Sequence, residues 1–383
     1  MVSCPQCSGK EGLQRAGFVR GKQRFFCGAC RYHFTVQSEI LPKKKRHQTT
    51  ILDIAAFLGI SASTVSRALL NRYGISEATR AEVLRVAQEL DYQPNLLAQS
   101  LSNQETHTIG VIIPDIERPF FASVVSGIQQ VASESGYRVM VCQSNESHQV
   151  EVANVQALVA SRVDGLLICH STETTTFEHI RLQHRKGIPI VHFDRVCEDI
   201  DTSKVVQDDF GGGAAVATHL IQEGHRRFAI LAGPENLLIS RHRVDGFLHV
   251  LKQEGIAPEE VMICHSQFKP AEALHALHSW RTLPQPPEAV FCVHYGNAID
   301  MMMEMKKNGG QIPQELAFAG FGEDKLAAVI EPGLTTVHQH PIEIGRQAAL
   351  LFLEQILAAD DFVPITRQIR GELIVRQSSV RKR

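Results

Sequence analysis

Short apolar runs alternate with helical patterns over most of the chain. Residues 109–114 form a buried-strand pattern that ends at a proline, and apolar residues then recur at helical spacing over 120–132. The same succession repeats until a last strand pattern at 316–321. This alternation favours parallel sheets covered by helices on both faces. The stretch is long for one such sheet, so we expect two lobes, with ligands bound beyond the carboxyl ends of the strands.

Four of the nine cysteines lie within the first 30 residues. Cys4 and Cys7 form one C-x2-C pair, and Cys27 and Cys30 form a second pair, separated from the first by 19 residues. This spacing is typical of a structural Zn2+ site, because four thiolates complete a tetrahedron and leave no open position. A segment this short buries little apolar surface, so the metal would supply much of its folding energy. We therefore predict a small zinc ribbon at residues 1–37.

The net charge of −2 conceals an uneven distribution. Residues 1–103 hold 14 Lys and Arg against 7 Asp and Glu, whereas residues 104–383 hold 25 against 34. A basic head on an acidic body indicates that only the head meets a polyanion. Residues 38–48 contain four consecutive basic residues and are interpreted as a linker. This linker either lies along a phosphate backbone or is a mobile spacer.

Residues 49–93 carry the pattern of three short helices. Thr50 and Asp53 fit a capping box, and Ser61 and Ser76 are suited to cap the second and third helices. Apolar residues follow each cap at helical spacing, and a glycine turn separates the first two helices. This arrangement predicts a helix-turn-helix, which is a DNA-binding motif.

The second helix of such a motif enters the major groove. Here it would present Ala62, Ser63 and Arg67 to base edges. Arg bonds guanine with two hydrogen bonds, Ser bonds several bases, and the Ala methyl contacts a thymine methyl. We therefore expect double-stranded DNA as a partner.

This segment resembles the lactose-repressor (LacI/GalR) family of transcription regulators. The match runs through residues 53–55, 59–61, 64–67, 76, 79–80 and 90–95. The resemblance implies base reading by Ala62, Ser63 and Arg67. It also implies that five further residues support phosphate contacts: Thr50, Ser61, Ser76, Thr79 and Tyr92. Leu70 departs from the family's usual Asn, and Asn71 follows one position later, so that phosphate contact is in question.

Residues 94–105 resemble the hinge helix of the same family. Asn95 is suited to cap this helix, and Leu101 matches the leucine that wedges into the minor groove. The alternative is an ordinary linker with a helical tendency. At the N-terminus, residues 3–7, 21–27 and 31–35 resemble the small zinc ribbons of some bacterial transposases. That second resemblance leaves open whether the ribbon contacts DNA or a protein partner.

The LacI/GalR resemblance continues through residues 106–377. It implies a two-lobed body of the periplasmic-binding-protein type, in which the chain crosses between lobes near residues 207, 340 and 366. Together with the ribbon and the all-α head, this two-lobed body would make the chain a multidomain protein. The resemblance implies an effector cleft between the lobes, with four contributing residues: Phe120, Phe121, Asp194 and Arg243. We also expect His294 and Tyr295 in this cleft, at positions where the family commonly has other residues.

Each of these roles has an alternative from the residues themselves. Phe120 and Phe121 would otherwise be core residues, and Asp194 would cap a turn. Arg243 would otherwise pair with Asp245 or Glu235.

Two departures from the family pattern bear on the effector. Residues 293–295 read Val-His-Tyr and residues 320–323 read Gly-Phe-Gly-Glu, so the family's usual Asp, which grips sugar hydroxyls, is missing. A neutral gap opposite Arg243 would tolerate an anion better than a neutral sugar. The variant also resembles gluconate-type members. We therefore expect a sugar acid such as gluconate, or a phosphorylated sugar.

The leading hypothesis is a repressor that binds operator DNA as a homodimer under the control of a small sugar or sugar acid. The helix at 120–132 would contribute to the dimer interface or pack within one lobe, and residues 378–383 would form a basic tail. Neither a secretory signal nor a membrane-length apolar run is present, which indicates a protein of the bacterial cytoplasm, associated with the nucleoid. The alternatives are a soluble sugar receptor without DNA control and an enzyme. We expect no enzyme, because no catalytic constellation is recognisable.

Overall fold

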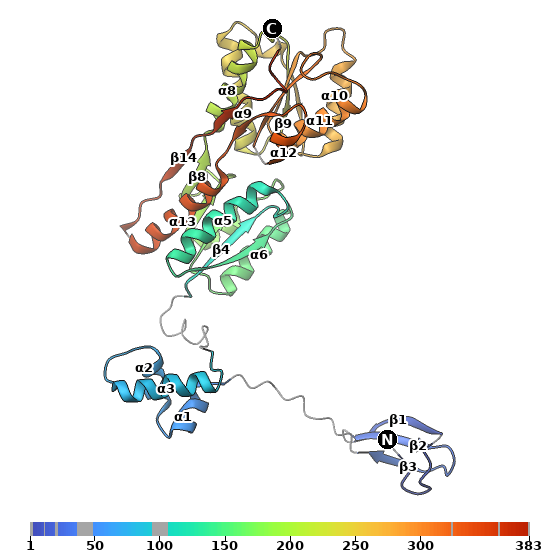
Figure 1. The fold of residues 1–383 in the computed structure, drawn as a ribbon, viewed down its shortest axis with the longest axis vertical. Coiled ribbons are helices and arrows are strands. Elements are labelled where there is room, and N and C mark those ends of the chain that lie inside the picture. The colour runs from blue at the N-terminus through green and yellow to red at the C-terminus, as the bar shows by residue number, and fades with distance from the viewer. Residues whose placement is uncertain are drawn as a thin grey trace. The chain divides into compact units, whose positions relative to one another are not determined.

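The computed structural model describes residues 3–10, 12–19, 22–36, 49–93, 106–322, 325–358 and 361–381. They form a small stranded ribbon, a helical head and a two-lobed body (Figure 1). The ribbon is an antiparallel sheet of β1 (Leu13–Val19), β2 (Lys22–Cys27) and β3 (His33–Val36). Its buried centre consists of Cys4, Cys27 and Phe34. Such a small apolar core needs additional cross-linking to be stable.

The head contains α1 (Ile51–Leu58), α2 (Ala62–Leu69) and α3 (Glu77–Glu89) within residues 49–93. A left-handed Gly59, with φ of 65°, ends α1 and allows the tight turn into α2. The three helices bury one apolar cluster that includes Ile54, Val65 and Val83. The predicted helix-turn-helix is therefore present.

The N-terminal lobe of the body is built on a six-stranded parallel sheet in the order β14-β8-β7-β6-β4-β5. Its strands are β4 (Thr108–Ile113), β5 (Arg138–Gln143), β6 (Gly165–Ile168), β7 (Ile190–Phe193), β8 (Ser203–Gln207) and β14 (Thr366–Ile369). Its helices are α5 (Pro119–Glu134), α6 (His148–Ala160), α7 (Glu178–Arg185) and α13 (Pro341–Ala358). The buried face of β4 and the helices α5 and α13 share one apolar core.

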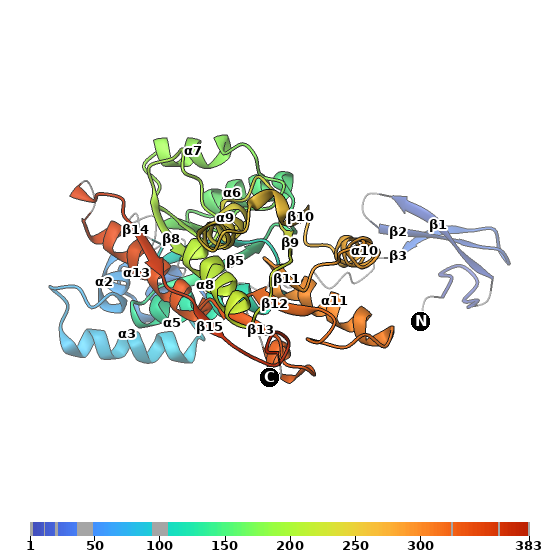
Figure 2. The ribbon, with the colours of Figure 1, turned by 90° about the horizontal axis from the view of Figure 1, so that it is seen from above.

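The C-terminal lobe has a sheet in the order β10-β9-β11-β12-β13-β15, in which only β15 runs antiparallel to its neighbour. Its strands are β9 (Phe228–Ala232), β10 (Met262–His265), β11 (Ala289–Cys292), β12 (Ala317–Phe321), β13 (Thr335–His338) and β15 (Glu372–Ile374). Its helices are α8 (Asp209–Gln222), α9 (Leu238–Gln253), the 3-10 helix η1 (Pro258–Glu260), α10 (Pro270–Arg281), α11 (Tyr295–Lys307) and α12 (Lys325–Val329). The helices α8 and α9 lie side by side (Figures 1 and 2).

The chain passes between the lobes three times, and two of these passages lie at the predicted positions. The first passage is at Asp208, between β8 and α8, and the second is at 339–340, between β13 and α13. The third lies at 370–371, between β14 and β15, rather than near 366, because residue 366 begins β14. All three passages join the same two lobes, which is the topology expected of a hinged body.

One expectation about the body needs correction, and another stays a prediction. The apolar face of the helix at 120–132 packs within its own lobe, against α13 and the sheet, and a contribution of this helix to a dimer interface remains a prediction. A Cβ at Gly127 would lie 2.1 Å from the Ile342 carbonyl oxygen, so the two helices approach closely. The basic tail does not begin at residue 378, because Ser378 and Ser379 are fully buried in the C-terminal lobe. Ser378 donates to the Phe318 carbonyl at 2.6 Å.

Among the described residues, a single helix long and apolar enough to cross a membrane is not found; α1 and α2 pass that test only as a pair bent by 111°.

Candidate functional sites

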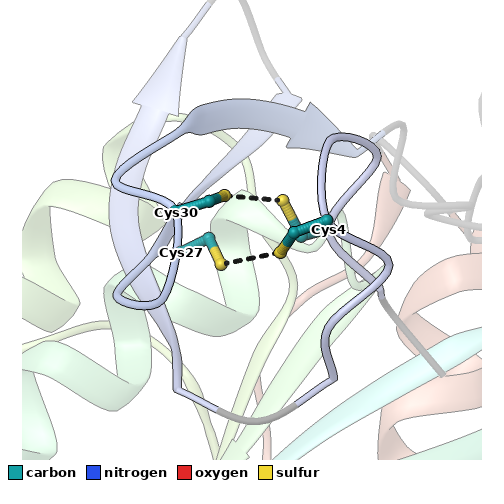
Figure 3. Close-up of side chains that lie close together, drawn as sticks. Cys4, Cys27 and Cys30 are labelled. Atoms are coloured by element: carbon teal, nitrogen blue, oxygen red, sulfur yellow. Dashed lines mark hydrogen bonds between the residues drawn. The ribbon is translucent and has the colours of Figure 1, made fainter.

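The four N-terminal cysteines converge at one end of the ribbon (Figure 3). The Sγ atoms of Cys4 and Cys30 lie 3.5 Å apart, and those of Cys7 and Cys27 lie 3.6 Å apart. All four Sγ atoms lie within 4.8 Å of one another. A tetrahedral ion with bonds of about 2.3 Å places its sulfurs about 3.8 Å apart. The four thiols therefore fit a metal ion with only small adjustments.

The ribbon also favours thiolate formation at one of these cysteines. A hydrogen bond from the Cys30 backbone lowers the pKa of the Cys27 thiol to about 7. A thiolate is the form that ligates metals.

The head places the predicted base-reading residues on one helix. Ser63 and Arg67 of α2 are exposed, and Ala62 is half-buried. Ser61 caps this helix by accepting from the Thr64 backbone N–H at 3.1 Å, and its Oγ also lies 2.8 Å from Ser63 Oγ. An Arg67 side chain in water, on a helix that is firmly capped, is available to bond a base edge.

The residues predicted to support phosphate contacts occupy helix ends. Thr50 and Asp53 form a capping box, and Ser76 accepts from the Thr79 backbone N–H at 3.2 Å. Tyr92 is half-buried against the apolar cluster of the head. Helix N-termini carry partial positive charge, which suits phosphate oxygens at four of the five predicted positions. The exception is Tyr92, which follows the C-terminal end of α3.

Three further predictions concern positions around the head. Leu70 ends α2 and Asn71 is left-handed, with φ of 55°. Asn71 is exposed, so an amide is still presented directly after the recognition helix. Asn95 and Leu101 lie outside the described residues, as do the linker at 38–48 and the whole of the predicted hinge at 94–105.

A cavity of about 180 Å³ lies between the lobes. The six residues predicted for the effector site all line it: Phe120, Phe121, Asp194, Arg243, His294 and Tyr295. They come from α5, the end of β7, α9 and the start of α11. The cavity also has lining residues that sequence reasoning did not assign to it: Glu117, Arg118, Pro119, Arg195, Ile239, Phe268, Phe321 and Gln339.

Arg243 is the most firmly held of these side chains. Its Nε donates to Asp209 Oδ1 at 2.7 Å and its Nη1 donates to the Val293 carbonyl at 2.8 Å. The guanidinium carbon lies 3.8 Å from the centroid of the Phe321 ring. The alternative prediction, in which Arg243 pairs with Asp245 or Glu235, is therefore wrong. The partner of Arg243 is Asp209. The idea of a gap without negative charge opposite Arg243 also needs correction, because Asp209 already faces it.

A second arginine cluster borders the cavity from the N-terminal lobe. Arg195 binds Glu146 through both Nη atoms, at 2.6 and 3.0 Å, and Arg118 Nη1 lies 3.3 Å from Glu146 Oε1. Because Arg195 directly follows Asp194 in the sequence, it could have been predicted as a cavity residue from the sequence. The other missed residues come from segments that sequence alone does not bring together, such as Phe268 and Gln339.

The polar groups of the cavity are strongly affected by burial. Burial, together with the charges of Arg118, Arg243 and Arg195, lowers the pKa of His294 to about 3. The ring is therefore neutral at physiological pH, and its Nδ1 is buried with no hydrogen-bond partner among the residues that the structure describes. Burial raises the pKa of Asp194, although Arg195 and Arg243 partly oppose this. Donors, acceptors and aromatic faces thus converge on one small volume, as is typical of a ligand site.

Comparisons with known proteins agree with both parts of this description. The family described as "Bacterial regulatory proteins, lacI family" matches residues 50–95. The family described as "Periplasmic binding proteins and sugar binding domain of LacI family" matches residues 106–376. Neither match includes the cysteine ribbon.

Individual relatives extend over nearly their full lengths. The HTH-type transcriptional repressor CytR of Escherichia coli strain K12 is 31% identical over 337 residues, which are 88% of this chain and 98% of the relative. The repressor PurR of Actinobacillus pleuropneumoniae serotype 3 is 27% identical over 86% of this chain and 98% of its own.

Solved structures share the fold. The Lac repressor dimer bound to operator and the anti-inducer ONPF has a TM-score of 0.77 at 22% identity, covering 87% of this chain and 99% of that one. The complex of the transcriptional regulator CelR with cellobiose has a TM-score of 0.65 at 25% identity, covering 86% and 99%.

Proposed function

The chain belongs to the LacI family of bacterial regulatory proteins, and we propose that it represses transcription by binding operator DNA as a homodimer, under the control of a small effector in the interlobe cavity. The observation that carries this proposal is the presence, in one chain, of an exposed reading helix and a built ligand cavity. Such a pair of sites allows an effector to change DNA affinity by favouring one lobe arrangement over another. The protein would act in the bacterial cytoplasm, at the nucleoid.

The proposed DNA site consists of α2 and the helix caps around it. Ala62, Ser63 and Arg67 would read bases, and Thr50, Ser61, Ser76, Thr79 and Tyr92 would support phosphate contacts. The hinge residues Asn95 and Leu101 would complete the contact at the centre of the operator. The lactose-repressor fold supports this placement, since one solved relative is a dimer bound to operator.

The proposed effector is a sugar acid such as gluconate, or a phosphorylated sugar. The relative CelR binds cellobiose, which supports a sugar-like ligand. Arg243 uses Nε and Nη1 inside the protein, and among the described residues its Nη2 has no hydrogen-bond partner. This Nη2 and the Nδ1 of His294 are two polar groups that an anionic oxygen and a hydroxyl would satisfy. Phe120, Phe121 and Tyr295 would contact the apolar faces of the ligand.

The four cysteines of the ribbon would hold a structural Zn2+. Their geometry supports a closed four-thiolate shell, which supplies folding energy and has no open position for chemistry. The ribbon would extend the operator contact or bind a partner.

A matched pair of ligands tests the effector proposal. Gluconate and glucose differ at one end, so thermal unfolding of the full chain with each compares a carboxylate with a neutral group. We expect gluconate, or glucose 6-phosphate, to raise the melting temperature more than glucose, because a ligand that binds the folded form stabilises it. Arg243→Lys keeps a cation beside Asp209 but removes Nη2, and it should abolish the difference. Arg241→Lys, at an exposed position on the same helix, is the control. Equal responses to gluconate and glucose would overturn the sugar-acid assignment.

A further inference from the structure

A second cluster of metal-ligating side chains lies in the N-terminal lobe, and none of its members lines the cavity. His148 and Glu151 are on α6, and His179 is on α7; these two helices lie side by side (Figure 2). One ligand atom of each residue lies within 4.8 Å of the other two. The His179 Nε2 is 2.9 Å from Glu151 Oε1, and the two imidazole rings meet edge to face with centroids 5.2 Å apart.

The carboxylate of Glu151 is fully buried, which is unusual for a charged group. Its Oε2 accepts from the backbone N–H of Ser171 at 2.6 Å and from Ser171 Oγ at 2.8 Å. Its Oε1 accepts from Thr174 Oγ1 at 3.1 Å. Within the described part of the chain, these partners and His179 surround the carboxylate without any Lys or Arg. A buried carboxylate without a full cationic partner has a large unfavourable desolvation energy.

We propose that His148, Glu151 and His179 bind a first-row divalent transition ion such as Zn2+, with solvent completing the coordination shell. Two imidazoles and one carboxylate are a ligand set that zinc accepts, usually with an open fourth position. The ion would supply the positive charge that the buried carboxylate lacks. A tetrahedral site separates neighbouring nitrogen and oxygen ligands by about 3.3 Å. The 2.9 Å contact between His179 and Glu151 therefore needs to open by only a few tenths of an ångström.

The hydrogen bonds around Glu151 are those expected of a shell that orients a metal ligand. Ser171 and Thr174 fix the plane of the carboxylate and leave Oε1 directed at His179. The carboxylate of Glu173 accepts from the His148 backbone N–H at 3.3 Å and adds negative charge beside the cluster. Negative charge next to the site favours a divalent cation.

The position of the cluster connects it to the contact between the lobes. Ser171 and Thr174 belong to the segment that joins β6 to α7, and the carbonyl of Thr172 in the same segment accepts from Asn236 Nδ2 of the other lobe at 2.8 Å. In addition, Arg195 donates to the His170 carbonyl at 3.2 Å. An ion on Glu151 would therefore brace the segment that touches both the other lobe and the wall of the cavity.

Zinc content of the full chain tests the proposal, provided that the ribbon is removed as a source of zinc. The variant Cys4→Ser with Cys7→Ser leaves the ribbon two thiols short. After equilibration with Zn2+ and removal of the unbound metal, we expect one ion per chain in this variant. Adding His148→Ala and His179→Ala should abolish that binding. Adding His184→Ala, a histidine of α7 outside the cluster, should leave it unchanged.

Circular dichroism of each variant verifies that the fold is retained, and His148→Ala alone serves if the variant with both histidines replaced does not fold. Zn2+ should also raise the melting temperature of the ribbon-deficient chain, and His148→Ala should remove this shift. The absence of bound zinc from the folded, ribbon-deficient chain would overturn the proposal. Zinc retained at full stoichiometry after replacement of His148 and His179 would overturn it as well.

Discussion

Asp209 and Arg243 form a buried ion pair at the wall of the cavity, with 2.7 Å between Oδ1 and Nε. Asp209 is the first residue of α8, directly after the chain enters the C-terminal lobe, and Arg243 lies in the middle of α9. The pair holds the guanidinium so that its remaining donor is not engaged within the described residues. A preorganised donor costs little to order when a ligand binds.

Breaking this pair should be costly for stability. Arg243→Ala leaves a buried carboxylate without its partner, and the expected loss in the free energy of unfolding is about 3 kcal/mol or more. Asp209→Ala should cost a similar amount. The double variant should lose less than the sum, with a coupling of about 1–3 kcal/mol in a urea-denaturation cycle. Additive losses would show that the pair does not act as a unit, and Arg241→Ala at an exposed site provides the control.

The neutral His294 predicts a pH dependence. Its folded-state pKa is lowered to about 3, mainly by burial, from the ordinary value of 6.5. Between these two pH values the unfolded chain binds a proton at His294 and the folded chain does not. The contribution of His294 to the free energy of unfolding is therefore complete above pH 6.5 and is lost as the pH falls toward 3. Below pH 6.5, the free energy of unfolding falls by about 1.4 kcal/mol per pH unit because of this group.

Urea unfolding of wild type and His294→Phe at about pH 6 and about pH 5 measures this contribution. The free energy of unfolding of the wild type should fall by about 1.4 kcal/mol more than that of the variant. His242→Phe, at an exposed position of α9, should follow the wild type. Identical slopes for wild type and His294→Phe would show that His294 titrates normally.

The close approach of α5 and α13 should be intolerant of side-chain atoms. Gly127→Ala would place a Cβ 2.1 Å from the Ile342 carbonyl oxygen, which is backbone and cannot rotate away. We expect a loss of about 1–3 kcal/mol in the free energy of unfolding. Ser126→Ala, at the exposed neighbouring position, should change stability by less than about 0.5 kcal/mol. Equal stability of the two variants would show that the helices separate easily.

The architecture was largely predictable because the head and the parallel strands have local signals. Caps, a glycine turn and helical spacing identify α1, α2 and α3, and continuous apolar runs identify buried strands such as β4 and β9. The short strands β8 and β14 were not predicted. They mix polar and apolar residues and pair across about 160 positions of sequence, so no local pattern marks them.

The site was predictable only where the family resemblance supplied positions. Asp209 was not predicted as the partner of Arg243, because Asp245 is only two residues away and Asp209 is 34. On α9 the exposed Asp245 points to solvent while Arg243 is buried, a distinction that depends on the packing of α8. Likewise, the cluster of His148, Glu151 and His179 depends on how α6 and α7 pack, which their separate sequences do not reveal.

The ribbon should depend on its metal. Removal of Zn2+ with a strong chelator should unfold the ribbon while the melting temperature of the head remains unchanged, because the ribbon's apolar core is very small. Co2+ substitution gives a direct optical signal of thiolate ligation, which Cys27→Ser should weaken. Cys142→Ser, in the body, should leave the signal as in wild type. A wild-type Co2+ spectrum without thiolate bands would contradict the four-thiolate site.

The central claim is that one ligand site controls one DNA-reading helix. The most direct measurement is the affinity of the full chain for DNA fragments selected from its own genome, with and without gluconate and related sugar acids, over a range of salt concentrations. Arg67→Ala should weaken specific binding by about 1–3 kcal/mol, and Arg85→Ala, whose side chain already pairs with Glu82 and Glu89, should have little effect. Arg243→Lys should bind DNA as wild type does but lose the response to effector. Wild-type DNA affinity that no cavity ligand changes, or equal binding by wild type and Arg67→Ala, would contradict the account.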